Sequence, residues 1–473
     1  MAPPATLRSG EPDRDTPHVI FIPSAGMGHL YPFFRFIAAL SSYGVDISVV
    51  TILPTVSAAE ADHFAGLFAA FPSIRRIDFH LLPLDTNEFP GADPFFLRWE
   101  ELRRSAHLLG PLIASATPRV STIVSDVTLA SHVIPIAKEL HIPCHVLFIS
   151  CATMLSLNAY FPVYLDTKAG MDGIGDVDIP GVCRIPKSSL PQALLDLNKL
   201  FTKQFIENGR EITKADGILV NTFDALEPKA LATLRDGTVV TRFPPVFAIG
   251  PLTSHSPAAG ERVDAGFPLA WLAEQPTRSV VYVAFGNRNA VTLDQIREIA
   301  VGLEASGFRF LWVLKTTVVD HEDTAELKDV LGDGFLERVK GRSLVTKAWV
   351  DQEAILKHPA VGLYLSHSGW NSVAEAAAYG VPMLAWPRGG DHRVNATVVV
   401  SGGVGVWMEH WSWDGEDRLV SGKEIGDKVK EVMLDAAVRA RAAKVGEEAD
   451  KALTEGGSSY RSMQQFVAKL KNN

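Results

Sequence analysis

The sequence is poor in cysteine and has no long hydrophobic run. Three cysteines, Cys144, Cys151 and Cys183, occur in 473 residues, too few and too unevenly spaced for a disulfide framework or a zinc site. We interpret them as buried thiols in a reducing compartment. The longest apolar runs, such as 19–23 and 280–285, fall far short of the roughly 20 residues that a membrane-spanning helix needs. These absences predict a soluble, cytoplasmic protein.

Positive charge is also in short supply. The chain has 45 Lys and Arg against 54 Asp and Glu, a formal net charge of −9, which argues against a general attraction to nucleic acid or anionic membranes. Residues 1–16 combine proline, arginine and acidic residues without an apolar core, so they resemble neither a secretory signal nor a transit peptide. We expect a disordered tail there, and a monomer whose partners are small molecules.

What the sequence does contain is the alternation typical of an α/β protein. Hydrophobic residues make up 47% of the chain, and its length predicts two domains. Short apolar runs alternate with helical stretches, as in parallel sheets covered by helices on both faces. Helices fit 31–42, 131–140, 293–306, 370–379 and 422–434. Strands are expected at 18–23, 46–52, 76–82, 122–125, 145–149, 217–221, 279–285, 308–314, 344–346, 361–365 and 382–386.

A stretch rich in proline, glycine and small polar residues divides these two arrays. It spans 251–266 and is predicted to be a linker between an N-terminal domain, 17–250, and a C-terminal domain, 267–455. Open parallel sheets bind ligands at the carboxyl ends of their strands, so two facing doubly wound domains create a cleft between those ends. This architecture suits an enzyme with two substrates.

The turn before the helix 370–379 is predicted to bind an anion. Residues 366–369 join the strand 361–365 to this helix, so unpaired backbone N–H groups point into the cleft. A diphosphate there would meet the helix N-terminus, the Ser372 hydroxyl and a donor from His367. The alternative is that 366–371 simply caps the helix, a common task for serine and asparagine.

The neighbours of this turn favour a nucleotide. Glu375, one helical turn after Asn371, can accept two hydroxyl hydrogen bonds, as a ribose requires. Trp349 offers a flat face for a base.

The stretch 349–392 resembles the signature box of the plant UDP-dependent glycosyltransferases from end to end. Within that family the chain is most similar to the C-glycosyltransferases of flavonoids and 2-hydroxyflavanones. The segments that carry this similarity are PSAGMGHL from Pro23, DPFFLRWEELRRS from Asp93, VDIPGVCRIPKSSLPQALLD from Val177, AFGNRNA from Ala284 and GVWMEHWSW from Gly405.

The resemblance implies the two-domain GT-B fold, with the acceptor in the N-terminal domain, the donor in the C-terminal one, and a helix within 456–473 that crosses back onto the first domain. UDP-sugar would be a co-substrate and no metal or other cofactor is implied. The resemblance also implies a role for each residue of the donor site. Trp349 would stack on uracil, the Val350 backbone would pair with the edge of the base, and Gln352 and Glu375 would hold the ribose. His367, Asn371 and Ser372 would bind the diphosphate, Trp370 would pack beneath, Asp391 and His392 would contact the sugar, and Gly28, Gly286 and Asn287 would complete the donor site.

His29 is the expected chemical centre. It follows the first strand in a loop with two glycines, which places its imidazole at the carboxyl end of the sheet. A histidine titrates near neutrality and can take a phenolic proton; the resemblance makes His29 the general base. Asp126, just past the strand 122–125, would hold the other ring nitrogen, and an acid followed by an aliphatic residue, Val127, resembles the C-forming members. The alternative is that both residues only cap helices.

The glycine loop also invites comparison with the dinucleotide fingerprint G-x-G-x-x-G. Gly26 and Gly28 fit, but the third position is Tyr31, followed by Pro32, which would disturb the close helix approach. A dehydrogenase is therefore a remote alternative, as is a protein that binds UDP-sugar without turnover.

Aromatic residues supply a candidate acceptor wall. Their helical spacing fits a core face equally well, so this wall stays a hypothesis; it comprises Phe95, Phe96, Trp99, Phe201 and Phe205.

These observations together predict an inverting C-glycosyltransferase acting on a flavonoid-type polyphenol, with a flavonoid O-glucosyltransferase as the alternative. His392 stands where glucose-using relatives usually have glutamine, and histidine there is associated with galactose or arabinose donors. We therefore expect glucose to be used and galactose or arabinose to be accepted as well.

Overall fold

The structure is a computed structural model. It describes residues 16–89, 94–168, 173–253, 266–286, 290–317, 323–411 and 418–472, apart from the side chains of 94–96 and 472. The predicted tail, except Thr16, and residues 254–265 of the predicted linker lie outside the described residues.

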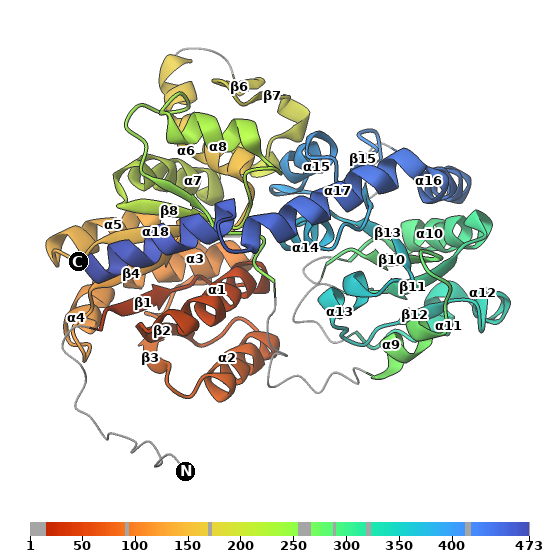
Figure 1. The fold of residues 1–473 in the computed structure, drawn as a ribbon, viewed down its shortest axis with the longest axis horizontal. Helices are drawn as coiled ribbons and strands as arrows, with labels where there is room; N and C mark the ends of the chain where they lie inside the picture. Colours follow the sequence, from red (N-terminus) through yellow and green to blue (C-terminus); the bar gives the residue numbers. More distant parts are fainter. Residues whose placement is uncertain are drawn as a thin grey trace, which may run out of the picture.

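The first half of the chain forms a parallel sheet of seven described strands in the order β3-β2-β1-β4-β5-β8-β9 (Figure 1). Its central strands are buried on both faces, which is why they read as continuous apolar runs rather than alternating ones. The strands are β1 (His18–Ile22), β2 (Asp46–Leu53), β3 (Arg75–His80), β4 (Thr122–Asp126), β5 (Cys144–Phe148), β8 (Gly217–Val220) and β9 (Val246–Ala248).

The second half repeats this design with six described strands in the order β12-β11-β10-β13-β14-β15. All of their pairings are parallel. The strands are β10 (Val280–Ala284), β11 (Arg309–Val313), β12 (Leu344–Thr346), β13 (Val361–Ser366), β14 (Met383–Ala385) and β15 (Gly405–Trp407).

Helices surround both sheets (Figure 1). Those of the first half are α1 (Met27–Leu40), α2 (Ala58–Ala70), α3 (Pro94–Ser105), α4 (Leu109–Ala114), α5 (Ala130–Glu139), α6 (Ala152–Thr167), α7 (Leu200–Glu211) and α8 (Pro228–Arg235). Those of the second half are α9 (Gly266–Ala273), α10 (Leu293–Ser306), α11 (Leu327–Leu331), α12 (Asp333–Val339), α13 (Gln352–Lys357), α14 (Trp370–Ala378), α15 (His392–Ser401), α16 (Gly422–Leu434), α17 (Ala436–Leu453) and α18 (Ser458–Asn472).

Helix α18 returns to the first sheet, as the blue helix beside the orange and green elements in Figure 1 shows. Its Phe466 is fully buried and meets the ring of Phe247 on β9 at a centroid distance of 6.1 Å. The Ser459 hydroxyl donates to the Gly250 carbonyl at 2.5 Å. The last helix of the chain therefore packs on the sheet that the first half of the chain forms.

The sequence pattern missed four strands and misjudged one thiol. The missed strands β9 and β15, and the antiparallel hairpin of β6 (Val177–Ile179) and β7 (Cys183–Ile185), have three residues each, which leaves little periodicity to recognise. The equally short β12 and β14 were nevertheless predicted. Cys144 and Cys151 are buried as predicted, whereas Cys183 is only partly buried because it lies in this hairpin, outside both parallel sheets.

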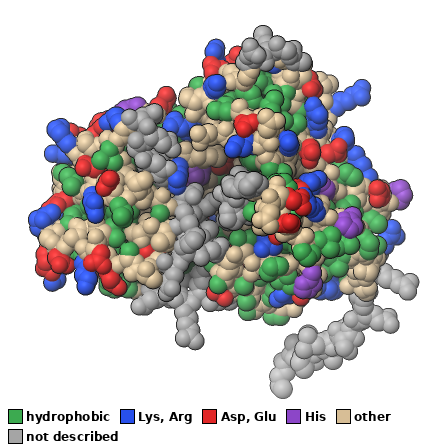
Figure 2. Space-filling model, turned by 180° about the vertical axis from the view of Figure 1, so that it is seen from behind, with side chains coloured by type: hydrophobic (Ala, Val, Ile, Leu, Met, Phe, Trp, Pro, Cys, Tyr) green, Lys and Arg blue, Asp and Glu red, His purple; other side chains and the backbone are tan. Residues whose placement is uncertain are grey.

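The surface seen from behind is hollowed between the two halves (Figure 2). Basic and acidic side chains are interspersed over both halves on this face. Within the described ranges, no helix is long and apolar enough to cross a membrane.

Candidate functional site

His29 and Asp126 lie together at the carboxyl edge of the first sheet. His29 Nδ1 is 2.9 Å from Asp126 Oδ2, and the histidine side chain is 15% exposed while the aspartate is fully buried. A carboxylate only accepts, so Nδ1 carries the proton and Nε2 is left as the acceptor. The other aspartate oxygen accepts from the Thr128 amide and hydroxyl at 2.8 and 2.7 Å. Asp126 therefore has two roles: one carboxylate oxygen caps the short turn that follows β4, and the other orients the His29 ring.

A glycine turn sets the position of His29. Gly26 has φ of 103°, a conformation that a residue with a side chain rarely adopts, and its N–H donates to the buried carboxylate of Glu60 at 2.7 Å. Helix α1 begins directly afterwards, without a side-chain cap. His29 thus lies in the first turn of α1 and is not its cap, contrary to the capping alternative.

Part of the predicted acceptor wall lies beside His29. The rings of His29 and Trp99 meet edge to face at 5.6 Å, Trp99 is followed by Phe201 at 6.1 Å, and Phe201 by Phe205 at 5.8 Å. Trp99 and Phe205 are each only 8% exposed. The side chains of Phe95 and Phe96 lie outside the described residues.

The predicted anion turn leads into α14 with its N-terminus uncapped. Gly369 is the N-cap and makes no side-chain bond, while Ser366 Oγ accepts from the Ser368 amide at 3.3 Å and Asn371 Nδ2 donates to the Gly28 carbonyl at 3.3 Å. Ser368 adopts φ of 65°, which costs a non-glycine residue about 1 kcal/mol or more. The helix-capping alternative is therefore wrong, because the N-cap position of α14 makes no side-chain hydrogen bond.

His367 fits between two glycines. A Cβ atom at Gly286 or Gly369 would come within 2.7 or 2.6 Å of its Nε2, so both positions need the absence of a side chain. The ring of His392 packs against it at 4.8 Å. Burial, and then the charge of His392, hold the pKa of His367 well below its ordinary range, so His367 is neutral and offers one N–H.

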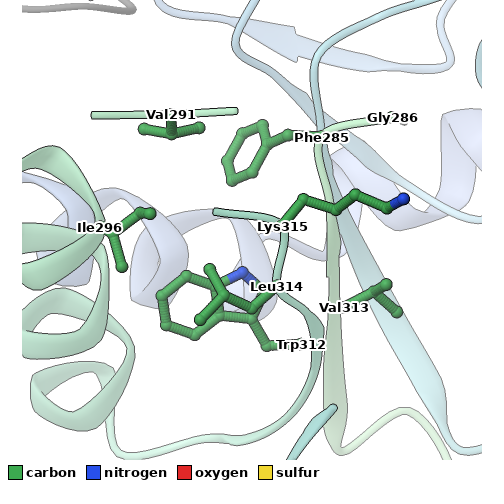
Figure 3. Close-up of a pocket in the computed structure, with 8 residues that line it drawn as sticks. All are labelled: Phe285, Gly286, Val291, Ile296, Trp312, Val313, Leu314 and Lys315. Carbon is green, nitrogen blue, oxygen red and sulfur yellow. The ribbon is translucent and has the colours of Figure 1, made fainter. Parts of the chain in front are cut away.

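A small apolar pocket lies under the Gly286 turn, at the carboxyl ends of β10 and β11 (Figure 3). The rings of Phe285 and Trp312 face it, whereas the Lys315 side chain extends to the other side. Its lining consists of Phe285, Gly286, Val291, Ile296, Trp312, Val313, Leu314 and Lys315. The pocket lies against the Gly286 turn, and its lining includes neither His29 nor Asp126. Asn287, predicted to bind the donor, lies outside the described residues.

The residues predicted to hold ribose share one polar network. Gln352 Nε2 donates to Glu375 Oε2 at 2.6 Å and to Ser372 Oγ at 3.1 Å. Its Oε1 accepts from Tyr364 and Tyr282 at 2.8 and 3.2 Å. Burial raises the pKa of Glu375. Ser372 is buried within this network and is bonded to protein groups.

The predicted sugar ligand Asp391 is held from both halves of the molecule. Its Oδ2 accepts from the hydroxyl of Ser150, which follows β5 of the first sheet, and from Asn395 Nδ2 at 3.0 Å. Asn395 also donates to the Ser368 carbonyl at 3.0 Å. These bonds tie the Asp391 carboxylate to the turn before α14.

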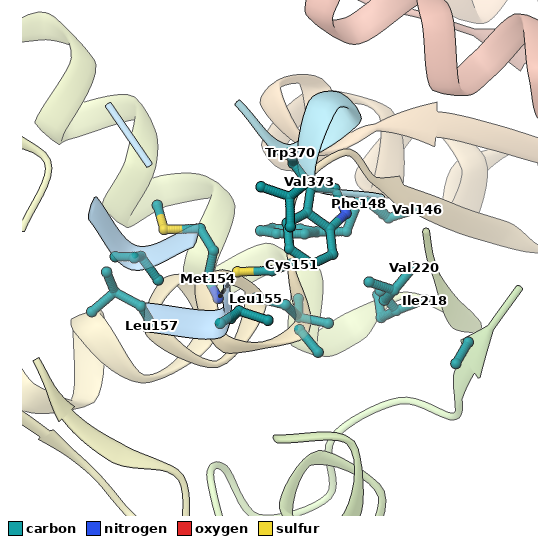
Figure 4. Packing of buried hydrophobic residues seen from close by; sticks show 14 of the residues in the cluster. Val146, Phe148, Cys151, Met154, Leu155, Leu157, Ile218, Val220, Trp370 and Val373 are labelled. Atoms are coloured by element: carbon teal, nitrogen blue, oxygen red, sulfur yellow. Dashed lines mark hydrogen bonds between the residues drawn. The ribbon is translucent and has the colours of Figure 1, made fainter. Parts of the chain in front are cut away.

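Trp370, the first residue of α14, lies in the core of the other half (Figure 4). It is 3% exposed, packs near Phe148 and Cys151, and donates from Nε1 to the Asn221 carbonyl at 2.8 Å. The predicted packing role of this residue extends across the seam between the sheets.

The two remaining residues predicted to bind the donor differ in their exposure. Trp349 is 39% exposed, with the His63 ring at 6.3 Å, and Val350 is buried at 8% exposure.

Sequence reasoning missed two groups that bond the predicted site residues. Ser150 directly follows a predicted strand, so the rule that ligands gather at carboxyl ends could have found it. Arg35, on α1, forms ion pairs with Glu353 and Glu375; a charged residue between Phe34 and Phe36 on a helix with an apolar face was the available signal. Among the residues that the structure describes, no group of three or more His, Cys, Asp or Glu could hold a metal ion.

Comparisons with known proteins identify the family of the chain. Residues 266–437 match the family model of UDP-glucoronosyl and UDP-glucosyl transferases. A UDP-glycosyltransferase named CGT from Oryza sativa subsp. indica is 59% identical over 463 residues, 97% of each chain.

Solved structures agree as well. The structure of LpCGTa in complex with UDP is 46% identical with a TM-score of 0.85, covering 96% of this chain and 99% of that one. Medicago truncatula UGT71G1 complexed with UDP-glucose is 28% identical with a TM-score of 0.84, covering 97% and 99%. The chain therefore belongs to the UDP-glycosyltransferase family, is a glycosyltransferase enzyme, and has the GT-B fold.

Proposed function

We propose that this enzyme transfers a sugar from UDP to a ring carbon of a flavonoid-type polyphenol, such as a 2-hydroxyflavanone or a dihydrochalcone. The observation that carries the proposal is the pairing of His29 with buried Asp126. This pair lies at the seam between the two halves, where Asn371 of α14 contacts Gly28. The name CGT, an abbreviation of C-glycosyltransferase, among the relatives supports the carbon linkage.

His29 would act as the general base. With its Nδ1–H donated to Asp126, Nε2 takes a proton from a phenol placed against Trp99 and Phe201. The phenolate spreads its charge onto the ring carbon flanked by two oxygens. Proton transfer by a positioned histidine contributes typically 10²–10⁴-fold to a rate.

The activated carbon then attacks the anomeric carbon from the face opposite UDP, which inverts the configuration. The new carbon–carbon bond forms as the carbon–oxygen bond to UDP breaks, and UDP leaves with the bonding electrons. The ring carbon afterwards loses its hydrogen as a proton, which restores the aromatic ring. Backbone N–H groups before Trp370, together with His367, would stabilise the charge on the departing diphosphate.

We assign the donor subsites as the family resemblance implies. Uracil would stack on Trp349 and pair with the Val350 backbone, ribose would bond to Gln352 and Glu375, and the diphosphate would lie near Gly28, Gly286, Asn287, His367, Asn371 and Ser372. Asp391 and His392 would bond to the sugar, which we propose to be glucose, with galactose or arabinose accepted as well.

We also propose that residues 17–250 form the acceptor domain and 267–455 the donor domain, and that the enzyme works as a cytoplasmic monomer.

The deciding experiment incubates purified protein with UDP-glucose, UDP-galactose and UDP-arabinose and a triphenolic acceptor such as phloretin. We expect a product that survives hot acid, because a carbon–carbon bond has no glycosidic oxygen to protonate, whereas an O-glucoside control releases its sugar. Acid release would identify an O-glycosyltransferase. UDP binding without turnover would indicate a non-catalytic binder, and oxidation of a reduced nicotinamide would indicate a dehydrogenase.

A further inference from the structure

Arg35 is a buried arginine that reaches from the first half of the molecule into the donor site. Its side chain is 8% exposed, and Nη2 lies 2.5 Å from Glu375 Oε1. The same nitrogen also pairs with the Glu353 carboxylate. Arg35 belongs to α1 and both glutamates belong to the second half, so one guanidinium joins the two.

The ion group is costly to bury. Burial raises the pKa of Glu375, against which Arg35 acts, and Arg35 Nε and Nη1 have no hydrogen-bond partner in the described part of the chain. Replacing a buried ion pair by apolar residues of similar size is often neutral or stabilising. Stability alone therefore gives a weak reason for placing an arginine here.

The contact fixes the orientation of Glu375. Arg35 occupies Oε1 at 2.5 Å and Gln352 occupies Oε2 at 2.6 Å, so both carboxylate oxygens are held by charged or polar donors. Each oxygen has two lone-pair sites and keeps one for a further hydrogen bond. The carboxylate is thus prepared to accept from two neighbouring hydroxyls.

The contact also fixes α1, which carries His29. Arg35 follows His29 by six residues on the same helix, a rise of about 9 Å along the axis. Helix α1 contacts α14 a second time, where Asn371 donates to the Gly28 carbonyl. His29 and the arginine that holds Glu375 therefore lie on the same helix.

We propose that Arg35 is a positioning residue for the donor: it holds Glu375 toward the ribose hydroxyls of the UDP-sugar and sets the distance between the donor and His29. The inference rests on the proposed function for the identity of the donor, and it adds a residue from the acceptor side to donor recognition.

Binding of UDP and of 2′-deoxy-UDP by calorimetry tests the proposal. Wild type should bind UDP more tightly than 2′-deoxy-UDP, because the latter lacks one hydroxyl. Arg35→Met should weaken UDP binding by about tenfold or more, as expected for a lost charge-assisted bond, and bring the two affinities together. Arg35→Lys keeps the charge without the planar fork and should restore part of the preference.

Two control variants separate this role from a general effect of charge. Glu353→Gln leaves the bond between Arg35 and Glu375 in place and should keep the preference for UDP. Arg76→Met removes an exposed ion pair with Asp78 and should change neither affinity. If Arg35→Met fails to fold, Arg35→Met combined with Glu353→Gln, which removes one buried negative charge, replaces it in the same measurement.

Turnover completes the test. A folded Arg35→Met enzyme should show a raised KM for the UDP-sugar and also a lower kcat, because His29 shares the helix. A folded variant that keeps the wild-type preference for UDP over 2′-deoxy-UDP overturns the proposal, as does a wild type without that preference. A wild type that shows the preference but never glycosylates a polyphenol refutes the proposed acceptor chemistry and leaves the assignment of Arg35 standing.

Discussion

His145 should make the protein sensitive to mild acid. It lies on β5 beneath α18, where its ring meets Phe466 edge to face at 5.1 Å, and it is 1% exposed. Neither ring nitrogen has a hydrogen-bond partner in the described part of the chain. Burial lowers the pKa of His145 from 6.5 to about 4, with Asp216 acting against the shift and Lys469 adding to it.

The sign and size of the effect follow from this pKa. The unfolded chain takes up the proton as the pH falls through 6.5, while the folded chain does so only near pH 4. The folded state is therefore favoured less and less over this window, and the loss is complete below it. Lowering the pKa of His145 from 6.5 to about 4 corresponds to about 3 kcal/mol in the free energy of unfolding.

The perturbation is His145→Leu, which removes the titrating group and keeps an apolar side chain under α18. Urea unfolding at several pH values between about 7 and 4 measures the free energy of unfolding of both proteins. We expect wild type to lose about 3 kcal/mol more than the variant over this range. His80→Leu, at an exposed position on β3, is the matched control and should follow wild type. Equal pH dependence in wild type and His145→Leu would refute the reasoning.

Three further outcomes are expected. His29→Ala should lower kcat by about 10²–10⁴-fold with an almost unchanged Kd for UDP in calorimetry; an active variant would mean that the acceptor ionises without His29. His392→Gln should move the preference between UDP-glucose and UDP-galactose toward glucose by about three- to tenfold, and an unmoved ratio in a competition assay would show that His392 does not contact the sugar. Trp370→Ala should cost about 3–5 kcal/mol in urea unfolding, and a loss below about 1 kcal/mol would contradict its place in the core.

The sequence predicted contacts inside one sheet better than contacts between sheets. His29 and Asp126 could be paired in advance because each follows a strand, and β1 and β4 turn out to be neighbours, so their carboxyl ends meet at one edge. The central strands were recognisable because burial on both faces leaves a continuous apolar run.

The bonds across the seam could not be predicted in the same way. Arg35 and Glu375 are 340 residues apart, and Ser150 and Asp391 are 241 apart. Helical or strand periodicity describes which face of an element is apolar, and it contains no information on how two separate sheets are placed relative to each other. A packing role for Trp370 was predicted, but its place near Phe148 of the other half could not be, for the same reason.

The return of α18 to the first sheet has a consequence for synthesis on the ribosome. About 210 residues separate β9 from α18, and translation at roughly 5–20 residues per second takes about 10–40 s to make them. During that time Phe36 and Phe247 lack the ring of Phe466, which contacts both of them in the folded protein. The first sheet is synthesised long before the helix that covers it. A nascent chain on a paused ribosome would therefore expose an apolar surface to which chaperones could bind and through which the chain could aggregate.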